Sequence, residues 1–481
     1  MTDELLKLVR RASAVTDRSE EVKPGSIFFA IRGTRFDGHG FIPRVLGRRP
    51  LAVVVERDYV PPKGLDLSKT RLIRVENTRR AFALACREFF GRPDERLKIL
   101  GVTGTNGKTS TTFILASLLE GLGFKTGVVG TVFYRAGGEV LGRGNTTPGP
   151  REWYSLLREM VKRGVRFVAA EVSSHALDQC RICGTRFEGV VFTNLSRDHL
   201  DYHRSLEDYF AAKRSLFSDY FYRAGAANFD DPFGRRLVGE FGLAGFGRSE
   251  GSDYRILSPS VSLSGSSFVL ETPEGRRVKV RTNLVGGFQI FNLAGALALL
   301  DRLGFELDEL VKVAERLEPI PGRFEKVFDG PFKVVVDYAH TPDALEKLLE
   351  SARRLTEGRL IVVFGAGGNR DRSKRAPMGR AAERFADLIV LTSDNPRFEE
   401  PEAIIADVLE GISDRSKVLV EPDRRRAIRL ALEAARPGDL VVVAGKGHED
   451  YQEIKGKRHP FDDRKVVLEL LEDLKNGFDN E

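Results

Sequence analysis

The sequence predicts an α/β protein with three domains, which we place at residues 1–90, 91–321 and 322–481. A chain of 481 residues is too long for one hydrophobic core and should divide into several. Apolar runs typical of buried strands alternate with helix-like stretches, which is the pattern of a mostly parallel sheet. The alternation starts anew after the segment PGRF (321–324). We therefore expect a small α/β domain, a central domain with a mostly parallel sheet, and a doubly wound C-terminal domain.

The first domain contains two short apolar strands and one helix. The strands are SIFFAI (26–31) and LAVVVE (51–56), and the helix is TRRAFALACREFF (78–90). The tripeptide Gly-Arg-Pro at 91–93 interrupts the helical pattern and indicates a linker to the next domain.

A glycine-rich loop follows the first strand of the central domain, KILGVTG (98–104). The usual phosphate-loop pattern G-x-x-x-x-G-K-[ST] would place its first glycine at position 102, which is Val102 here. Every part that touches phosphate is nevertheless present, because glycines let backbone N–H groups approach, Lys108 reaches phosphate oxygens and Thr109 can hold Mg²⁺. A purely structural turn would not need lysine and threonine in series at the start of a helix. The predicted nucleotide site comprises Gly104, Thr105, Asn106, Gly107, Lys108, Thr109 and Ser110.

Two later strands of the central domain end in residues that can bind a metal. Glu171 ends the apolar strand RFVAAE, and the carboxyl ends of strands line the ligand crevice of an open α/β sheet. A strand-end glutamate is also common without any function, and both interpretations stay open. The next strand ends in VFTNLSRDHLDYH, whose tip carries Asp198, His199, Asp201 and His203. A lone histidine would be read as structural, but His199 falls on the neighbouring edge of the predicted crevice.

Lys213 falls on the apolar face of the helix in SLEDYFAAKRSLF. That face is marked, at i, i+3 and i+4 spacing, by Leu206, Tyr209, Phe210, Leu216 and Phe217. A lysine that points inward loses solvent, and a neutral amine can react with carbon dioxide to give a carbamate that binds metal. Spacing alone favours the other interpretation, a lysine whose ammonium reaches back to solvent.

The C-terminal domain contains five apolar strands, and polar, turn-rich tips follow them. Four of these tips carry the chemistry: DYAH (337–340), GAGGNRDR (365–372), SDNPR (393–397) and GKGHE (445–449). The carboxyl ends of parallel strands meet at one edge of a sheet, so the four tips should converge on a single ligand crevice. The segment GAGGNR lacks the third glycine of a dinucleotide fingerprint and is only a weak signal for one.

Composition excludes several other classes of protein. The net charge is +7, but the basic residues are scattered among acidic ones, so we expect no nucleic-acid partner and a polyanionic small substrate instead. No apolar run is long enough to span a membrane, and no signal peptide is visible, which predicts a cytoplasmic protein. We expect a monomer.

With only Cys86, Cys180 and Cys183 there is no disulfide framework, and we interpret the C-x-x-C spacing of the last two as coincidental.

The chain resembles the Mur ligases of peptidoglycan synthesis from about residue 17 to about residue 465. The motifs that carry the resemblance are, in order, TGTNGKT, NTTPGP, EVSSHALDQCR, VFTNLSRDHLDYH, AAK, PGRFE, DYAHTPDAL, GAGGNRDRSKR, DNPR and GKGHEDYQ. The displaced glycine of the phosphate loop is a feature of this family. The resemblance implies a UDP-binding first domain, a central ATPase and a C-terminal Rossmann-like domain for the incoming amino acid. It also implies a ligase that activates a D-glutamate side-chain carboxylate with ATP as an acyl phosphate, which the amino acid's amine then attacks.

The resemblance assigns metal and nucleotide roles to individual residues. A first Mg²⁺ would be bound by Thr109 with Glu171, and a second by Glu171, His199 and carbamylated Lys213, which reverses the interpretation of Lys213 from spacing alone. Asn292 would contact adenine, although Gln289 stands where the family often has asparagine. Further ATP contacts would come from Arg323, Asp337 and His340.

Substrate roles follow from the same motif matches. The UDP group would be bound by Ser19, Thr34, Arg35 and Phe36, and the muramoyl-peptide by Asn145, Thr146, Thr147, Ser173, Gln179 and Arg181. The amino acid would be bound by Arg370, Asp394, Asn395, Pro396, Arg397, Gly445 and Glu449.

The tip DNPR is similar to that of the branch that adds meso-diaminopimelate to UDP-N-acetylmuramoyl-L-alanyl-D-glutamate. Diaminopimelate differs from lysine by a distal carboxylate, for which Arg397 offers a planar fork of two hydrogen bonds, while Glu449 would hold the distal ammonium. Three alternatives remain at this stage: the same ligation with L-lysine, a folylpolyglutamate-type ligase, and an ATPase that moves on nucleic acid. Binding of a uridine nucleotide separates the first from the second, and ATP hydrolysis that nucleic acid stimulates and that needs no amino acid would indicate the third.

Overall fold

The computed structural model of the chain describes residues 2–33, 36–200 and 202–478. The chain divides into two compact units, of which the first is Met1–Gly104, Leu115–Phe192 and Phe210–Ala226. The second is Thr105–Ile114, Thr193–Tyr209 and Ala227–Glu481. The domain boundaries at residues 90 and 321 stay a prediction. None of the described helices is long and apolar enough to cross a membrane.

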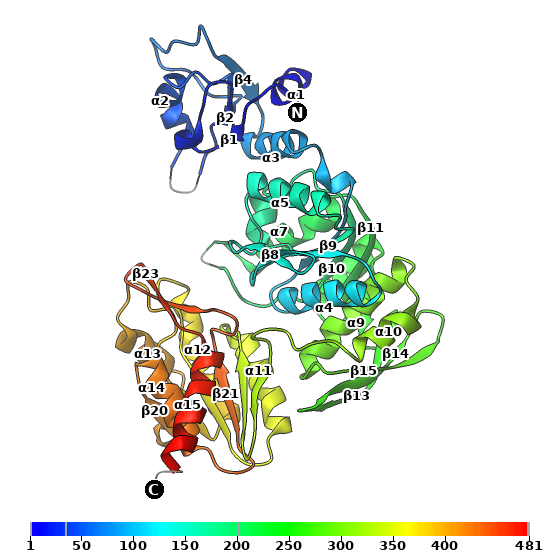
Figure 1. Cartoon of the computed structure of the whole chain (residues 1–481), viewed down its shortest axis with the longest axis vertical. Helices are drawn as coiled ribbons and strands as arrows, with labels where there is room; N and C mark the ends of the chain where they lie inside the picture. The colour runs from blue at the N-terminus through cyan, green and yellow to red at the C-terminus, as the bar shows by residue number, and fades with distance from the viewer. Residues whose placement is uncertain (1, 34–35, 201, 479–481) are drawn as a thin grey trace. The chain divides into compact units, whose positions relative to one another are not determined.

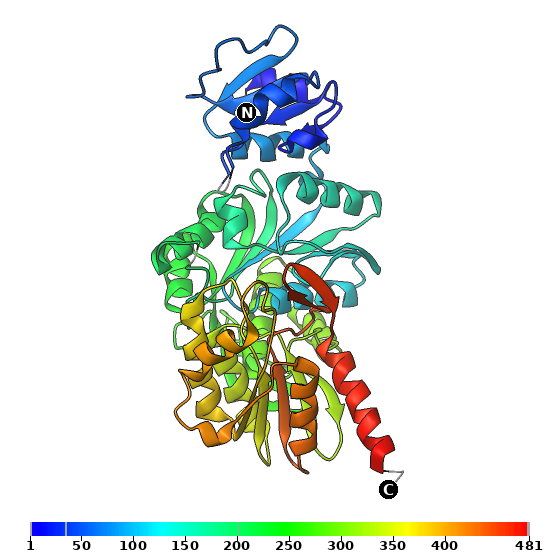
Figure 2. The same ribbon diagram turned by 90° about the vertical axis from the view of Figure 1, so that its left-hand side faces the viewer.

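The N-terminal part of the first unit is a four-stranded parallel sheet in the order β1-β2-β3-β4. Figure 2 shows this part in blue. Its strands are β1 (Val15–Thr16), β2 (Ile27–Phe29), β3 (Ala52–Glu56) and β4 (Arg71–Val75), and its helices are α1 (Asp3–Val9), α2 (Ile42–Leu46) and α3 (Thr78–Phe89). The predicted strands and helix of this part are confirmed. On one face of the sheet Phe28, Val53 and Val55 pack on Ile42 and Val45 of α2.

The remainder of the first unit contains seven neighbouring strands of one sheet, in the order β11-β10-β5-β9-β6-β7-β8. Its strands are β5 (Lys98–Thr103), β6 (Thr126–Val129), β7 (Tyr134–Ala136), β8 (Glu139–Gly142), β9 (Phe167–Glu171), β10 (Phe187–Phe192) and β11 (Tyr222–Asn228). The helices along this stretch are α4 (Lys108–Gly121), α5 (Pro150–Lys162), α6 (Ser174–Asp178) and α7 (Leu206–Ser218). Because β10, β5, β9 and β6 are parallel, the sheet is mostly parallel as predicted, while β7 pairs antiparallel with both β6 and β8.

The second unit contains a group of strands that the sequence did not predict. They are β12 (Ala244–Gly247), β13 (Tyr254–Ser262), β14 (Gly265–Glu271) and β15 (Arg277–Thr282), and β13, β14 and β15 form an antiparallel meander. The helices that accompany them are α8 (Pro232–Phe241), α9 (Gly287–Arg302) and α10 (Leu307–Ala314). Helix α9 is apolar on nearly all sides and is buried along most of its length.

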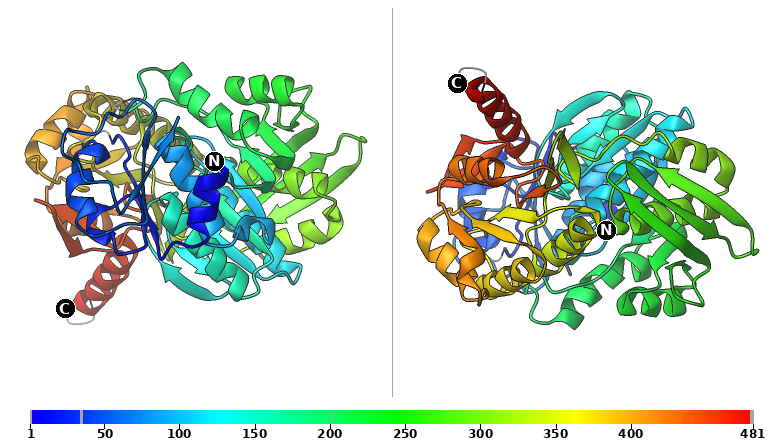
Figure 3. Two further views of the ribbon diagram at one scale, coloured as in Figure 1. Left: turned by 90° about the horizontal axis from the view of Figure 1, so that it is seen from above. Right: turned by 90° about the horizontal axis from the view of Figure 1, so that it is seen from below.

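The C-terminal sheet of the second unit is doubly wound, as predicted (Figure 1). Its order is β16-β17-β21-β18-β19-β20, from β16 (Glu325–Asp329), β17 (Lys333–Asp337), β18 (Leu360–Phe364), β19 (Leu388–Leu391), β20 (Val418–Val420) and β21 (Leu440–Ala444), and all are parallel except β16. One face packs on α11 (Pro342–Leu355), α12 (Arg375–Phe385) and α13 (Pro401–Leu409), and the other on α14 (Arg424–Ala434) and α15 (Asp463–Phe478). Figure 3 shows α15 at the end of the chain. A hairpin of β22 (Tyr451–Ile454) and β23 (Lys457–Pro460) precedes α15.

Candidate active site

The glycine-rich loop is shaped by hydrogen bonds to the segment that follows β10. The N–H of Thr105 donates to Asn194 O at 2.8 Å, and the N–H of Asn106 donates to Asn194 Oδ1 at 3.0 Å. In return, Asn194 Nδ2 and Thr193 Oγ1 donate to Asn106 O at 3.0 and 2.6 Å. Thr193 and Asn194 were not predicted as site residues. Their sequence signal is a polar pair at the end of an apolar strand, which marks a crevice edge in such sheets.

Lys108 and Thr109 both have protein partners in this structure. Lys108 Nζ donates to Thr105 O at 2.8 Å, and Arg323 Nη2 donates to Thr109 Oγ1 at 3.2 Å. Gly107 has a φ of +85°, and a Cβ there would lie 2.4 Å from Asn292 Oδ1, so a side chain does not fit. The loop therefore keeps a bare backbone at the point where phosphate oxygens would approach.

Asn292 lies in the first turns of α9, buried beside Gln289. Its Nδ2 donates to Gln289 Oε1 at 3.0 Å, and Thr111 Oγ1 donates to its Oδ1 at 3.4 Å. The amide thus helps to hold the start of α4. Its predicted contact with adenine stays a prediction.

The predicted ATP residues of the C-terminal region gather around Tyr338. The Arg323 guanidinium lies 4.5 Å from the centre of the Tyr338 ring, and His340 Nδ1 lies 2.9 Å from Tyr338 O. Asp337 ends β17 and accepts the N–H groups of Phe324 and Ala339, each at 2.7 Å. Burial raises the pKa of Asp337, and burial lowers the pKa of His340. The pKa of His340 therefore lies below that of a free imidazole.

Glu171 is buried at the end of β9 and oriented by Thr131. The N–H of Thr131 donates to Glu171 Oε1 at 2.8 Å, and its hydroxyl donates to Oε2 at 3.1 Å. A Cβ at Gly130 would lie 2.4 Å from Oε1, so the chain passes the carboxylate without a side chain. Sequence reasoning missed Thr131, because nothing near it in the chain shows that it faces a strand end forty residues away.

Lys213 is 1% exposed, and its Nζ donates to Gly104 O at 2.7 Å. The interpretation from spacing alone, a lysine that reaches solvent, is therefore wrong. Its helical face is occupied by buried apolar residues such as Phe210 and Leu216, which leave the ammonium no route outward. Carbamylation of Lys213 stays a prediction.

His199 has a φ of +55° and its side chain is partly exposed, with Nε2 at 3.5 Å from Asp198 Oδ2. Burial opposes ionisation of Asp198, but the charges of His199, His340 and Lys374 outweigh it and lower the pKa of Asp198. His203 is buried, and its ring centre lies 5.1 Å from that of Tyr209. Asp201 lies outside the described residues.

The donor set predicted for Mg²⁺ consists of a hydroxyl at Thr109, a carboxylate at Glu171, an imidazole at His199 and a carbamate at Lys213. Mg²⁺ prefers oxygen ligands and commonly takes several from substrate phosphates. The hydroxyl and the carboxylate fit this preference, and Lys213 fits it when carbamylated, because an ammonium in its place would repel the ion. The imidazole nitrogen of His199 is the one donor that does not match it.

The residues predicted for the muramoyl-peptide form one hydrogen-bond network in the first unit. Thr147 Oγ1 donates to Glu171 O at 2.7 Å and accepts the N–H of Ser173 at 3.0 Å. Arg181 Nη1 donates to Thr147 O at 2.9 Å, and its Nη2 donates to Gln179 Oε1 at 3.0 Å. This network links the end of β9 to the turn that follows α6.

Asn145 and Thr146, the first two residues of this predicted set, contact other residues of the same unit. The hydroxyls of Thr146 and Thr131 lie 3.0 Å apart, and Tyr134 Oη donates to Asn145 O at 2.7 Å. Because Thr131 also contacts Glu171, the structure brings Thr146 to the predicted metal carboxylate.

The structure describes two of the four residues predicted to bind the UDP group. Ser19 is buried, with its Oγ 3.5 Å from Glu20 Oε2, and the Phe36 ring is 74% exposed. An exposed aromatic ring is suited to stacking on a base. Thr34 and Arg35 lie outside the described residues.

The tips of β19 and β21 form a compact polar cluster that contains three of the predicted amino-acid-binding residues. Asn395 Nδ2 donates to Glu449 Oε2 at 2.9 Å, and Lys446 Nζ lies 3.2 Å from Asn395 Oδ1 and 3.3 Å from Glu449 Oε2. Asp394 Oδ1 is buried 3.6 Å from Lys446 Nζ and accepts no hydrogen bond from the residues that the structure describes. An acceptor of that kind is suited to an incoming ammonium. Burial, with the charge of Asp394, raises the pKa of Glu449.

Arg397 reaches the tip of β18. Its Nη1 donates to Gly368 O at 2.7 Å, and its Nε lies 3.3 Å from Glu453 Oε2. The N–H of Gly368 donates to Asn395 O at 2.9 Å, and a Cβ there would lie 2.0 Å from Pro396 O. The two tips are therefore packed backbone to backbone.

The remaining members of the predicted amino-acid set are Arg370 and Gly445. Arg370 is exposed. Gly445 has a φ of +113°, and a Cβ there would lie 3.2 Å from Asp394 Oδ2, so this position favours glycine.

Three buried cations behind these tips were not predicted from the sequence: Lys446, Arg424 and Arg375. Lys446 belongs to the cluster above. Arg375 pairs with Glu399 and Asp407 at 2.9 and 2.7 Å, and its Nη2 donates to Gly367 O at 3.3 Å. The two arginines could have been found from the sequence, because each lies on an otherwise apolar face of a helix. A globular protein rarely buries an arginine without partners.

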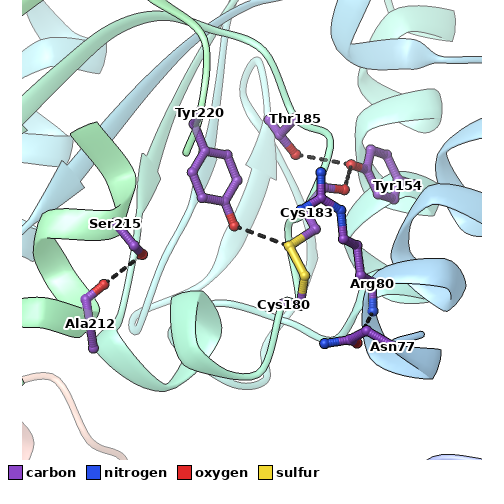
Figure 4. Close-up of a disulfide and its surroundings, with 9 residues drawn as sticks. All are labelled: Asn77, Arg80, Tyr154, Cys180, Cys183, Thr185, Ala212, Ser215 and Tyr220. Carbon is purple, nitrogen blue, oxygen red and sulfur yellow. Dashed lines mark hydrogen bonds between the residues drawn. A yellow bond between two sulfur atoms is a disulfide. The ribbon is translucent and has the colours of Figure 1, made fainter. Parts of the chain in front are cut away.

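Cys180 and Cys183 form a disulfide, with Cα atoms 5.0 Å apart (Figure 4). The interpretation of their spacing as coincidental is therefore wrong. The turn after α6 brings positions three apart within the distance that a disulfide spans. Cys86 is buried with a free thiol, and burial raises its pKa.

Two family descriptions match the chain: the Mur ligase middle domain at residues 102–300 and the Mur ligase glutamate ligase domain at residues 322–447. A UDP-N-acetylmuramoyl-L-alanyl-D-glutamate–2,6-diaminopimelate ligase of Aquifex aeolicus (strain VF5) is 50% identical, over 96% of this chain and 94% of its own. A protein of the same name from Thermosynechococcus vestitus is 42% identical, over 95% of this chain and 92% of its own.

Solved structures agree with these sequence matches. A structure of an enzyme of that name is 35% identical with a TM-score of 0.70, and the match covers 96% of this chain and 95% of that one. A MurF ligase from Thermotoga maritima in complex with ADP, 21% identical with a TM-score of 0.62 and coverage of 98% and 99%, shares the fold. The chain is an ATP-dependent ligase that forms amide bonds. It belongs to the Mur ligase family.

Proposed function

We propose that this chain joins an amine of meso-diaminopimelate to the D-glutamate side-chain carboxyl of UDP-N-acetylmuramoyl-L-alanyl-D-glutamate. The observation that carries the proposal is the polar cluster at the tips of β19 and β21, where Asp394, Asn395 and Glu449 surround a buried cation. The two relatives named above, whose printed names give this reaction, support it over nearly the whole chain.

The reaction would proceed in two steps at the carboxyl group. An oxygen of the D-glutamate carboxylate attacks the γ-phosphorus of ATP, ADP leaves, and an acyl phosphate results. The amine then attacks the acyl carbon, the tetrahedral intermediate loses phosphate, and the amine nitrogen gives up a proton. Lys108 would turn from Thr105 O to the phosphates, and Arg323 would balance their charge from its place beside Thr109.

Mg²⁺, when bound, would screen the repulsion between the carboxylate and the triphosphate. We propose Thr109, Glu171, His199 and carbamylated Lys213 as its ligands from the chain. The Thr131 N–H and hydroxyl would keep the Glu171 carboxylate oriented for this role. We further propose that residues 1–90, 91–321 and 322–481 are the UDP, ATP and amino-acid domains, and that the enzyme acts as a cytoplasmic monomer.

The test is an assay of ADP release with the UDP-dipeptide and, in turn, meso-diaminopimelate, L-lysine and L-ornithine. We expect turnover that requires both the UDP-dipeptide and diaminopimelate. Equal turnover with L-lysine would contradict the assignment of the amino acid. Failure to bind the UDP-dipeptide would contradict the whole proposal in favour of a folylpolyglutamate-type ligase.

A further inference from the structure

The disulfide between Cys180 and Cys183 encloses a residue of the predicted muramoyl-peptide site. Arg181 stands between the two cysteines in sequence, and Gln179 directly precedes them. Arg181 bonds to both Gln179 Oε1 and Thr147 O, so the cross-linked turn and the substrate network are one continuous structure. Breaking or forming the disulfide therefore affects Arg181 directly, because Arg181 is the next residue in the chain after Cys180.

The first half of the turn is held in an unfavourable backbone conformation. Cys180 has a φ of +55°, in the left-handed region that residues other than glycine seldom adopt. The disulfide ties this residue to Cys183, which is anchored independently because Tyr154 Oη donates to Cys183 O at 2.8 Å. Tyr154 in turn lies 3.2 Å from Thr185 Oγ1. Within the turn, the N–H of Cys180 donates to Leu177 O at 3.1 Å and the N–H of Arg181 donates to Ala176 O at 2.8 Å, so these bonds and the disulfide together hold the left-handed residue. Without the cross-link the hydrogen bonds hold it alone, and the position of Arg181 is less firmly fixed.

The surroundings of the disulfide suit exchange with thiols. Both cysteines are partly accessible, and a ring closed by residues only three apart gains little from chain entropy. Tyr220 Oη lies 3.5 Å from Cys183 Sγ, and Figure 4 draws Arg80 of α3 in the same neighbourhood. Burial raises the pKa of Tyr220 and the charge of Arg80 opposes this rise, so the cation lies near the tyrosine that contacts Cys183. A nearby cation and a hydroxyl donor both favour a thiolate as leaving group.

We propose that Cys180–Cys183 is a reversible thiol–disulfide site that sets the affinity of the enzyme for its UDP-muramoyl-dipeptide substrate. This inference rests on the proposed function. A dithiol reductant attacks one sulfur as a thiolate and forms a mixed disulfide, and its second thiol then releases the cysteine. Two electrons and two protons pass to the protein, which gains two thiols, while the reductant becomes a disulfide. The oxidised form holds Arg181 on Thr147 and binds the substrate more tightly.

The first measurement counts thiols and does not depend on activity. Full-length protein treated with oxidised or reduced dithiothreitol is denatured, alkylated and weighed by mass spectrometry. We expect one alkylated cysteine, Cys86, in the oxidised sample and three in the reduced one. Three in both samples would overturn the inference.

The second measurement is the dissociation constant of UDP-N-acetylmuramoyl-L-alanyl-D-glutamate for the two forms, by calorimetry. We expect the reduced form to bind the UDP-dipeptide about tenfold more weakly. That ratio corresponds to the free energy that a left-handed conformation costs at one residue. The affinity for ATP should be equal in both forms. Equal substrate affinities would overturn the inference while leaving the proposed function intact. If neither form binds the UDP-dipeptide, the proposed function fails and this inference fails with it.

Two variants separate this disulfide from other thiol effects. Cys180→Ser/Cys183→Ser should bind the UDP-dipeptide as weakly as the reduced enzyme whatever the redox treatment. Cys86→Ala, which removes the free buried thiol, should keep the full difference between oxidised and reduced forms. A double variant that binds like the oxidised enzyme, or a Cys86→Ala variant without the difference, would contradict the assignment.

Discussion

Arg424 and Asp463 form an ion pair in which neither side chain is exposed to solvent. Arg424 Nε and Nη2 donate to the two carboxylate oxygens at 2.8 and 2.7 Å. Its remaining hydrogen bonds go to Ser393 O at 3.3 Å and to Ala444 O at 3.0 Å. Ser393 begins the tip of β19 and Ala444 directly precedes the tip of β21, so the pair joins the two strand ends that carry the predicted amino-acid pocket.

Replacing one partner of this pair should lower the stability of the protein. Replacing both should restore stability and leave the binding of diaminopimelate impaired. Arg424→Met leaves a buried carboxylate without a partner, and we expect the free energy of unfolding to fall by about 3–5 kcal/mol. Arg424→Met/Asp463→Leu should recover most of that loss, because two well-packed apolar side chains replace the pair. The double variant still lacks the bonds to Ser393 O and Ala444 O, so its KM for diaminopimelate should stay raised while its KM for ATP is unchanged. Denaturant unfolding and steady-state kinetics measure both, and a wild-type KM for diaminopimelate in the double variant would show that the pair is only structural.

Lys213→Ala should abolish ligation, because it removes the side chain that would supply a carbamate ligand to Mg²⁺. A short carboxylate or added bicarbonate should restore part of the ADP release, since either can place an anion in the space that is left. Lys213→Arg is the matched control, because it keeps the charge but cannot form the carbamate, and it should also be inactive. Labelling of the wild type with ¹³C-bicarbonate should give a carbamate signal in NMR. An unmodified ammonium in an active, metal-loaded crystal would contradict this assignment.

Arg397→Ala should reduce catalytic efficiency with diaminopimelate far more than it reduces ATP affinity, because the distal carboxylate would lose the guanidinium that we propose as its partner. In the wild type, L-lysine should be disfavoured by about 10⁴-fold, the scale seen where a closed site leaves a buried polar group unpaired. Arg384 is a suitable control, since it is an exposed arginine that pairs with Glu346 at 2.6 Å and belongs to none of the predicted sites. Arg384→Ala should leave both parameters near wild type. Efficient use of L-lysine by the wild type would refute the role given to Arg397.

The pH dependence of diaminopimelate binding should report on Glu449. Burial and the charge of Asp394 raise the pKa of this carboxyl above its usual 4.5, although Lys446 opposes the shift. Only the ionised form attracts an ammonium, so affinity should be complete above the raised pKa and decline as the pH falls through it. In Glu449→Gln the affinity should be lower at neutral pH and this acid-side decline should vanish. Binding curves between pH 4 and 8 test the point, and an identical decline in the variant would assign it to another group.

The sequence by itself determined the features that depend on neighbours along the chain. The apolar runs of the parallel strands and the periodic helices between them were read correctly, because a buried strand or an amphipathic helix shows its environment in its own residues. The strand-end tips followed from the same reading, since parallel strands carry their carboxyl ends to one edge. The meander of β13, β14 and β15 was missed, because much of it is half-exposed and its alternation is interrupted by a bulge after Leu257.

Only the tertiary structure decided which side chains meet across long separations. Thr131 orients Glu171, Asn194 shapes the glycine loop at Asn106, and Arg424 reaches an aspartate thirty-nine positions away. It also decided that Lys213 is buried, because spacing places a residue on a helical face but not the partner that covers that face. Burial and pairing depend on what packs against a residue, and that partner comes from another part of the chain.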